Sequence, residues 1–131
     1  MKVFAGRKGF TLIEMLVVVA IIGILSATVL AALGPSRNKA KDARIISGIS
    51  QALVLAETLY DSSDVNHYTR VSLTQPDIMK VATDVTAQGG ALQINIASSS
   101  VAFYSTLASG GTYCADSLGQ TGDSANNGVC Q

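Results

Sequence analysis

The sequence predicts an α+β protein in which one long N-terminal helix packs on a small antiparallel β-sheet. Three observations support this fold class. Residues 15–33 form an apolar run of nineteen residues without a charge, and apolar residues recur beyond it at steps of three or four. The segments 91–97 and 101–107 alternate apolar with polar or small residues, as half-buried strands do. Outside the apolar run, about a hundred residues remain to fold in water, enough for one small domain.

The charges of the chain are distributed in blocks, although the formal net charge is zero. Residues 1–9 carry three basic residues and no acid, residues 37–44 carry four basic residues and one acid, and the chain from residue 45 onward is acidic. An acidic domain argues against nucleic acid binding by the domain alone, because phosphate neutralisation needs clustered Lys and Arg. The basic stretch 37–44 could still meet phosphate, either of lipid headgroups or of DNA.

The apolar run is long enough to cross a bilayer, since a helix needs about 20 apolar residues to do so. Basic residues flank the run on both sides, so the positive-inside rule does not decide its orientation. Cys114 and Cys130 are the two cysteines of the chain, and an even count in a small exported domain predicts a disulfide. We therefore expect the N-terminus in the cytoplasm and the cysteines on the oxidising side of the membrane.

Two other interpretations fit the charge and hydropathy pattern. In the first, the segment is a secretory signal peptide that is cut before Ala32 and releases a small secreted domain. In the second, the chain is a bitopic protein whose helix anchors a small exported binding domain. Glu14 argues against a cleaved signal peptide, because a carboxylate just inside an apolar run costs up to about 2.5–3.5 kcal/mol if it lies deep in the bilayer, so its presence implies a use.

The segment from Gly9 to Glu14 reads GFTLIE; two basic residues precede it and the apolar run follows it. In this combination it closely resembles the processing motif of type IV prepilins and pseudopilins. In that family a membrane-embedded prepilin peptidase cuts after the glycine and methylates the new N-terminal amine. The resemblance therefore implies a basic leader at residues 1–9, cleavage between Gly9 and Phe10, and N-methylation of Phe10.

The resemblance also implies a structural protein and not an enzyme: a subunit of a type IV pilus or pseudopilus filament. Such a subunit polymerises with copies of itself or related pilins, on an assembly platform in the inner membrane. Before assembly it is a single-pass precursor surrounded by membrane lipid, and the filament lies outside the cell or in the periplasm. No cofactor and no metal are expected, while adhesion, motility, DNA uptake and secretion all stay open as its role.

Glu14 lies about one helical turn beyond Phe10. Cleavage places a cationic amine on Phe10, and inside an apolar bundle each charge is costly unless it is paired. We expect the Phe10 amine of one subunit to meet the Glu14 carboxylate of its neighbour and to set the register of assembly. The alternative for Glu14 is a helix N-terminal acid that the macrodipole favours by about a few tenths of a kcal/mol.

Gly34 and Pro35 divide the predicted helix into a transmembrane and assembly half at 10–34 and an amphipathic half at 35–60. Pro35 removes one backbone donor and clashes with the preceding turn, so a kink or a melted turn is expected at Gly34 and Pro35. In the second half, a stripe of apolar residues is predicted to face the core. The residues of this stripe are Ala43, Ile46, Ile49, Leu53, Ala56 and Tyr60.

A small α+β domain is expected at 61–131, after turn-forming residues that end the long helix. Its first element is a short helix that runs to about Val85. A capping box at Thr74–Asp77, with Pro76 just inside the helix start, predicts this element.

Strands are expected next. The segments 91–97 and 101–107 should pair as an antiparallel hairpin, and residues 112–115 predict a third strand. The remainder, to Gln131, is expected to be a loop that the disulfide between the two cysteines closes.

Other chemistry finds weaker support in the sequence. A nucleophilic pair of His67 and Cys114 has no third group to orient the histidine, and Cys130 competes for the thiol, so His67 is expected in a surface loop. Polar residues of the last loop could collect a calcium ion, but their spacing matches no calcium motif and such residues are common in turns. They are Asp116, Asp123, Asn126 and Asn127.

Overall fold

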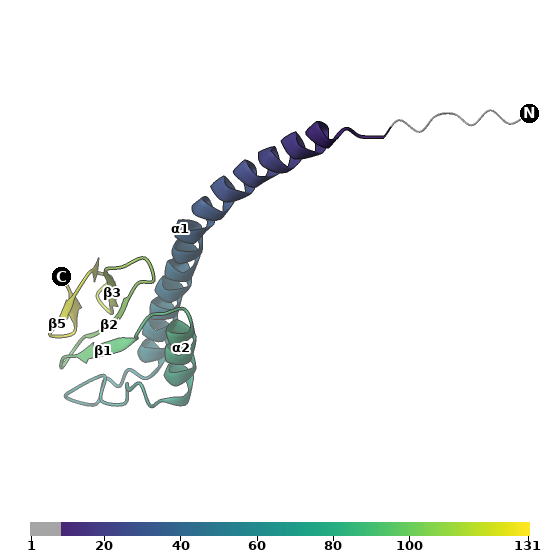
Figure 1. Cartoon of the computed structure of the whole chain (residues 1–131). Helices are drawn as coiled ribbons and strands as arrows, with labels where there is room; N and C mark the ends of the chain where they lie inside the picture. Colours follow the sequence, from purple (N-terminus) through teal and green to yellow (C-terminus); the bar gives the residue numbers. More distant parts are fainter. Residues whose placement is uncertain (1–8) are drawn as a thin grey trace, which may run out of the picture. The chain divides into compact units, whose positions relative to one another are not determined.

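The computed structural model describes residues 9–131, so the predicted basic leader lies outside the described residues except for Gly9. In this part of the chain, helix α1 at Leu12–Thr58 and helix α2 at Pro76–Ala87 precede six strands (Figure 1). The chain forms two compact units, an N-terminal unit that ends at Gly34 and a C-terminal unit at Pro35–Gln131. The predicted α+β class, with a long N-terminal helix and a small antiparallel sheet, is confirmed.

Helix α1 passes through Gly34 and Pro35 without a break. A proline inside a helix removes one hydrogen bond and costs about 3 kcal/mol or more. The apolar segment that precedes Pro35 nevertheless favours continued helix. The melted turn expected at this point is therefore absent from the structure. The kink at Gly34 and Pro35 stays a prediction.

The part of α1 in the C-terminal unit buries one face, formed by Ile45, Gly48, Ile49, Ala52 and Ala56. Two residues of the predicted stripe, Ile49 and Ala56, belong to this face, whereas Ala43 and Tyr60 are exposed. The stripe is confirmed for Ile49, Ala56 and the half-buried Leu53, which packs against the core, and it is wrong for Ala43 and Tyr60. Apolar side chains adjoin the buried face on both sides, so their 3.6-residue repeat fits more than one register.

Helix α2 packs closely against α1 at Gly48. A side-chain carbon at Gly48 would lie 2.7 Å from Val85 Cγ2, so the absence of a side chain lets the two helices approach. Ile78 and Val85 of α2 are fully buried in the same core. At the edge of this contact, Arg44 Nη2 lies 3.7 Å from Asp84 Oδ1, an exposed ion pair that adds little stability.

The start of α2 differs from the prediction in its capping. The helix exists, but its N-cap is Gln75, which makes no side-chain capping bond. Thr74 Oγ1 instead lies 2.8 Å from Ser72 Oγ, so the capping box predicted at Thr74–Asp77 is wrong. Pro76 explains the shift, because proline prefers the first helical position and thereby makes its predecessor the cap.

The sheet contains four antiparallel strands in the order β1-β2-β3-β4. They are β1 at Gln93–Ile96, β2 at Val101–Thr106, β3 at Thr112–Asp116 and β4 at Thr121–Gly122. The predicted hairpin is confirmed, with Gln93 opposite Tyr104, and so is the third strand. The sequence predicted only a loop after it, which is wrong.

Two short strands complete the chain, β5 at Ala125–Asn126 and β6 at Val129–Cys130, and they pair with each other. Each has two residues, too few to show an alternating pattern. Their position depends on contacts with distant residues: Gly128 N donates to Asn95 Oδ1 at 2.8 Å, and Ser100 Oγ donates to the carbonyl of Asn127 at 3.3 Å. The two residues between the strands, Asn127 and Gly128, have positive φ angles of 50° and 71°. An Asn-Gly pair is a local hairpin signal, and the sequence analysis missed it.

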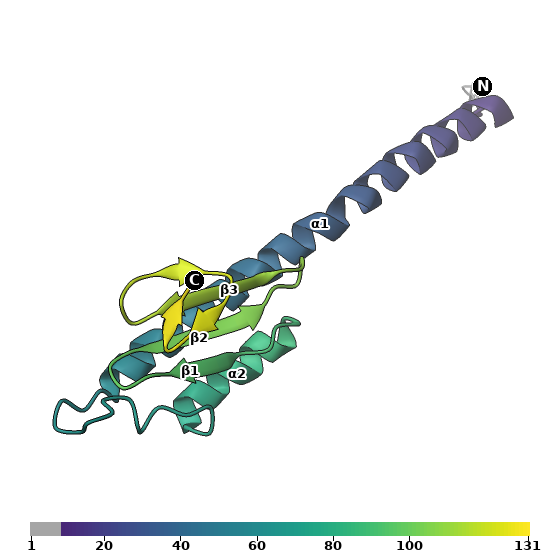
Figure 2. The same cartoon turned by 90° about the vertical axis from the view of Figure 1, so that its left-hand side faces the viewer.

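Strand β2 contributes side chains to two buried clusters, and Figure 2 shows this strand between β1 and β3 in the sheet. On one face, Val101 and Phe103 join the main core with the two helices. On the other face, Ala102 packs with Cys114 and Cys130 in a second, smaller cluster. The sheet is thus covered on both faces, by the helices on one and by the C-terminal segment on the other.

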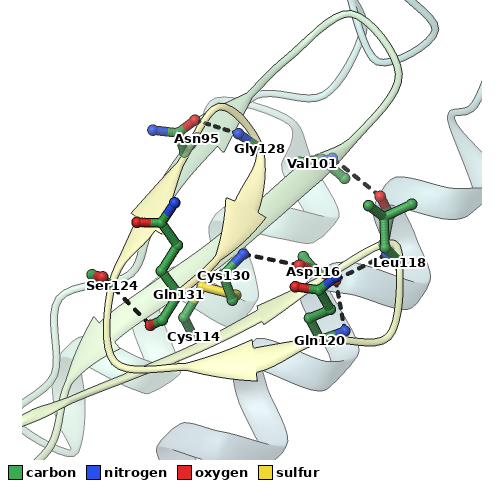
Figure 3. The surroundings of a disulfide bond; sticks show 11 residues. Asn95, Val101, Cys114, Asp116, Leu118, Gln120, Ser124, Gly128, Cys130 and Gln131 are labelled. Carbon is green, nitrogen blue, oxygen red and sulfur yellow. Dashed lines mark hydrogen bonds between the residues drawn. A yellow bond between two sulfur atoms is a disulfide. The ribbon is translucent and has the colours of Figure 1, made fainter.

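The predicted disulfide between Cys114 and Cys130 is confirmed, with the two Cα atoms 5.8 Å apart. It ties β3 to β6 across the second cluster (Figure 3). Closing a loop of this length stabilises a domain by roughly 3 kcal/mol, mainly by restricting the unfolded chain.

Asp116 is a buried carboxylate beside the disulfide, with 1% of its surface exposed. Its Oδ1 accepts hydrogen bonds from the backbone N–H of Leu118 at 2.9 Å and of Gln120 at 2.8 Å. Its Oδ2 accepts one from the N–H of Cys130 at 2.9 Å (Figure 3). One side chain therefore holds both the turn after β3 and the last strand. Sequence analysis missed this role.

Replacing Asp116 with Asn should destabilise the C-terminal unit. The amide nitrogen cannot accept a hydrogen bond, so at least one backbone donor loses its partner. We expect the free energy of unfolding to fall by about 2–3 kcal/mol. Urea unfolding of the full chain in detergent micelles, followed by circular dichroism with the disulfide intact, measures the change.

The matched control is Asp123→Asn, which alters an exposed carboxylate in the same region. Its free energy of unfolding should stay within about 0.5 kcal/mol of wild type. Equal destabilisation by the two changes would contradict the role of Asp116.

Candidate functional site

The start of α1 carries the residues that the sequence singles out. Gly9 and Phe10 precede the helix, Thr11 lies directly before its first residue, and Glu14 lies in its first turn. Phe10 is 79% exposed. The bond between Gly9 and Phe10 therefore lies outside the helix.

Thr11 and Glu14 form a reciprocal capping box at this helix start. Glu14 Oε2 accepts hydrogen bonds from the backbone N–H and from the hydroxyl of Thr11, both at 2.8 Å. The backbone N–H of Glu14 in turn donates to Thr11 Oγ1 at 3.3 Å. These bonds satisfy backbone donors that the first helical turn leaves without partners.

Sequence analysis missed Thr11, although its signal was present. A Thr followed three residues later by Glu at the start of an apolar run is the pattern of a capping box. The macrodipole alone does not describe the role of Glu14 at the helix start, because two hydrogen bonds from Thr11 hold its carboxylate in place.

The capping box fixes the Glu14 carboxylate at the N-terminal end of the helix, beside a shallow concavity. The concavity is lined by Phe10, Ile13, Glu14, Val17 and Val18. Apart from Glu14 its lining is apolar, and an apolar wall strengthens the attraction of a carboxylate for a cation. Within residues 9–131, Glu14 Oε1 has no hydrogen-bond partner. The arrangement can bind one positively charged group through this oxygen.

Beyond Glu14 the helix is apolar on all sides, and its side chains from Met15 to Leu33 are exposed. Among the described residues, α1 alone is long and apolar enough to cross a membrane, with a mean hydropathy of 2.8 in its most apolar window. A helix that is hydrophobic all round requires a protein core or a membrane. Lipid or other helices must therefore cover this segment.

The remaining predicted residues lie in the C-terminal unit and form no reactive site. Cys114 is bonded to Cys130, so it offers no thiolate to His67. His67 lies in a loop as predicted, but it is half-buried, with Nδ1 3.0 Å from the carbonyl oxygen of Asp61. Residues 9–131 contain no cluster of three or more His, Cys, Asp or Glu side chains that could hold a metal ion.

Comparison with known families gives a match at the N-terminus. The model of the prokaryotic N-terminal methylation motif matches residues 5–30. This range includes Gly9, Phe10, Glu14 and most of the apolar run, so the resemblance drawn from the segment Gly9–Glu14 is confirmed. No curated protein and no solved structure matches the chain significantly.

Replacing Thr11 with Ala should loosen the first turn of α1, because it removes the side-chain half of the capping box. Loss of an N-cap costs about 1 kcal/mol, equivalent to roughly fivefold faster amide exchange in the first turn. Hydrogen exchange of the full chain in micelles, followed by mass spectrometry of N-terminal peptides, measures it. Thr11→Ser keeps the hydroxyl and should exchange as wild type does; loss of protection in both variants would rule out the capping box.

Proposed function

We propose that this chain is a structural filament subunit of the type IV pilin kind, since its N-terminal methylation motif is the signature of type IV pilins and pseudopilins. Prepilin peptidase removes residues 1–9 and methylates Phe10, and the mature helix then carries the subunit into a filament. The observation that supports this proposal most strongly is the motif at residues 5–30, placed at the start of an exposed apolar helix.

The exposed helix explains why such a subunit needs two environments. The apolar helix and the motif fit a membrane-anchored precursor, in which lipid covers the side chains from Met15 to Leu33. In a filament, helices of other subunits replace the lipid. Lipid tails are as apolar as these side chains, so burial alone gives no driving force for the exchange. Polar contacts at the helix start therefore have a large effect on whether and how subunits associate.

Glu14 and the Phe10 amine provide such a contact. A carboxylate surrounded by apolar helices is costly unless it is paired. Thr11 satisfies Oε2 of Glu14, and Oε1 is left to accept the Phe10 amine of a neighbouring subunit. The capping box and the intersubunit pair are therefore compatible, because each uses a different oxygen.

The same geometry couples assembly to processing. In the uncut chain the Phe10 nitrogen is a neutral amide, which carries no charge to offset the Glu14 carboxylate. Cleavage after Gly9 converts it to a cationic amine. Only processed subunits then offer both partners of the pair, so uncut precursors are excluded from the filament.

Removing the Glu14 carboxylate should block assembly without blocking insertion or cleavage. Glu14→Ala leaves the neighbouring amine unpaired in an apolar core, at a cost of about 3–5 kcal/mol per buried contact. We expect the variant to be cut, to stay in the membrane, and to be missing from sheared surface filaments. Immunoblots of the sheared fraction, with intact-mass measurement of the membrane fraction, give both readouts.

Glu14→Gln separates the two roles of this side chain. Glutamine can still complete a capping box, but it carries no charge, so it should fail to assemble as Glu14→Ala does. Asp123→Asn, which removes an exposed acid elsewhere, should assemble normally. Normal filaments from Glu14→Gln would contradict the charge pair, and absence of the wild-type chain from sheared filaments would point to a membrane anchor that does not polymerise.

A further inference from the structure

A group of basic side chains follows the apolar segment, in the part of α1 that begins the C-terminal unit. Arg37, Lys39 and Lys41 are all exposed. Among residues 9–131, none of the three takes part in an ion pair or a side-chain hydrogen bond, whereas the next cation, Arg44, faces Asp84. Residues 1–8 contain no acid that could pair with them.

The single acid near this group is already engaged. Asp42 is the one acidic residue between Glu14 and Glu57, and its Oδ1 accepts a hydrogen bond from the backbone N–H of Ser109 at 3.1 Å. This bond directs the carboxylate toward the turn between β2 and β3. Within residues 9–131, the three cations are left without an acidic partner.

The three side chains surround the helix. Positions four apart lie on the same side, so Arg37 and Lys41 are neighbours, whereas positions two apart differ by about 200° and place Lys39 on the opposite side. A duplex of DNA or a protein groove would contact one side of the helix. A layer that encircles the helix can contact all three cations, and the headgroup layer of a membrane has this geometry.

The length of the uncharged segment places the cations at such a layer. No charged residue occurs from Met15 to Ser36, a stretch of 22 residues. At 1.5 Å per residue this helix length is about 33 Å, close to the roughly 30 Å of bilayer hydrocarbon. With Glu14 at one boundary, Arg37 is the first charge at the other, and long basic side chains extend from there into the headgroups.

We infer that Arg37, Lys39 and Lys41 form a collar that binds the phosphate groups of anionic lipids at the exported surface of the membrane. The inference rests on the membrane-inserted subunit of the proposed function. The collar sets the depth of the helix before assembly. A subunit that enters a filament gives up these lipid contacts.

Spin-labelled lipids test the collar in the full chain. The chain is reconstituted in phosphatidylcholine bilayers that contain trace spin-labelled phosphatidylglycerol or spin-labelled phosphatidylcholine, and electron spin resonance gives the fraction of each label held at the protein. One basic residue near an anionic surface is worth roughly a fivefold change in association. We expect at least about a fivefold preference for phosphatidylglycerol, weakened by high salt.

Variants assign the preference to the collar. The triple variant combines Arg37→Gln, Lys39→Gln and Lys41→Gln. Glutamine is a good helix former, so α1 should persist while the preference for phosphatidylglycerol over phosphatidylcholine falls to a ratio close to one. The matched control, Arg70→Gln with Lys80→Gln, removes exposed cations outside the collar and should retain it. Equal association of both labels with wild type, or an unchanged preference in the triple variant, would overturn the proposal.

Competition identifies the source of the phosphate. Excess inorganic phosphate at constant ionic strength, or a short DNA duplex, should leave the lipid preference intact; displacement by either assigns the site to that ligand and overturns the lipid proposal. Reconstitution needs neither cleavage nor polymerisation, so the lipid measurement can be interpreted even if the chain forms no filaments. Extraction of the chain from the vesicles at alkaline pH would instead contradict membrane insertion, on which both proposals depend.

Discussion

The constraint on which the rest of this molecule depends is an apolar helical segment that its own chain does not cover. From Met15 to Leu33 every side chain is exposed, and no described residue shields the segment from its surroundings. Water is therefore excluded as its environment. In the account that we propose, lipid covers the segment while the subunit is alone, and the equivalent helices of other subunits cover it in the filament.

The charges at the two ends of this segment follow from the same constraint. A polar group at the edge of an apolar helix needs a partner in each environment that the helix visits. At the N-terminal end, Thr11 takes one oxygen of Glu14, and in the filament subunit that we propose the other oxygen accepts the amine that processing creates. At the opposite end, Arg37, Lys39 and Lys41 have no acidic partner in the described part of the chain, which suits them to a surface of lipid phosphates. The C-terminal unit is stabilised separately, by a sheet covered on both faces, by the disulfide and by Asp116.

The sequence predicted those features that depend on local patterns. The long helix, the short helix after Pro76, the hairpin of β1 and β2, and the strand β3 all have periodicity or turn residues of their own. Local patterns do not decide whether a capping box forms. The same pattern occurs at Thr74–Asp77 and at Thr11–Glu14, but a capping box forms only at Thr11–Glu14. Proline at the first helical position moves the start of α2 past Thr74, and a glutamate reaches back to its cap more easily than the shorter aspartate does.

Other features depend on residues distant in the sequence. Asp116 fixes Cys130, fourteen residues away, and strands β5 and β6 depend on Asn95 and Ser100. No local pattern marks such a buried carboxylate, so Asp116 resembled an ordinary turn residue. The buried face of α1 was ambiguous for a related reason, since only packing against α2 and the sheet selects among adjacent apolar faces.

The most direct test of the central claim is the mass and N-terminal sequence of the mature chain recovered from membranes. Our account predicts a chain that begins at Phe10 and carries one methyl group on its amine. A chain that begins at Met1 would indicate an uncleaved membrane anchor, and one that begins near Ala32 would indicate release by signal peptidase. Either result would contradict processing as a filament subunit.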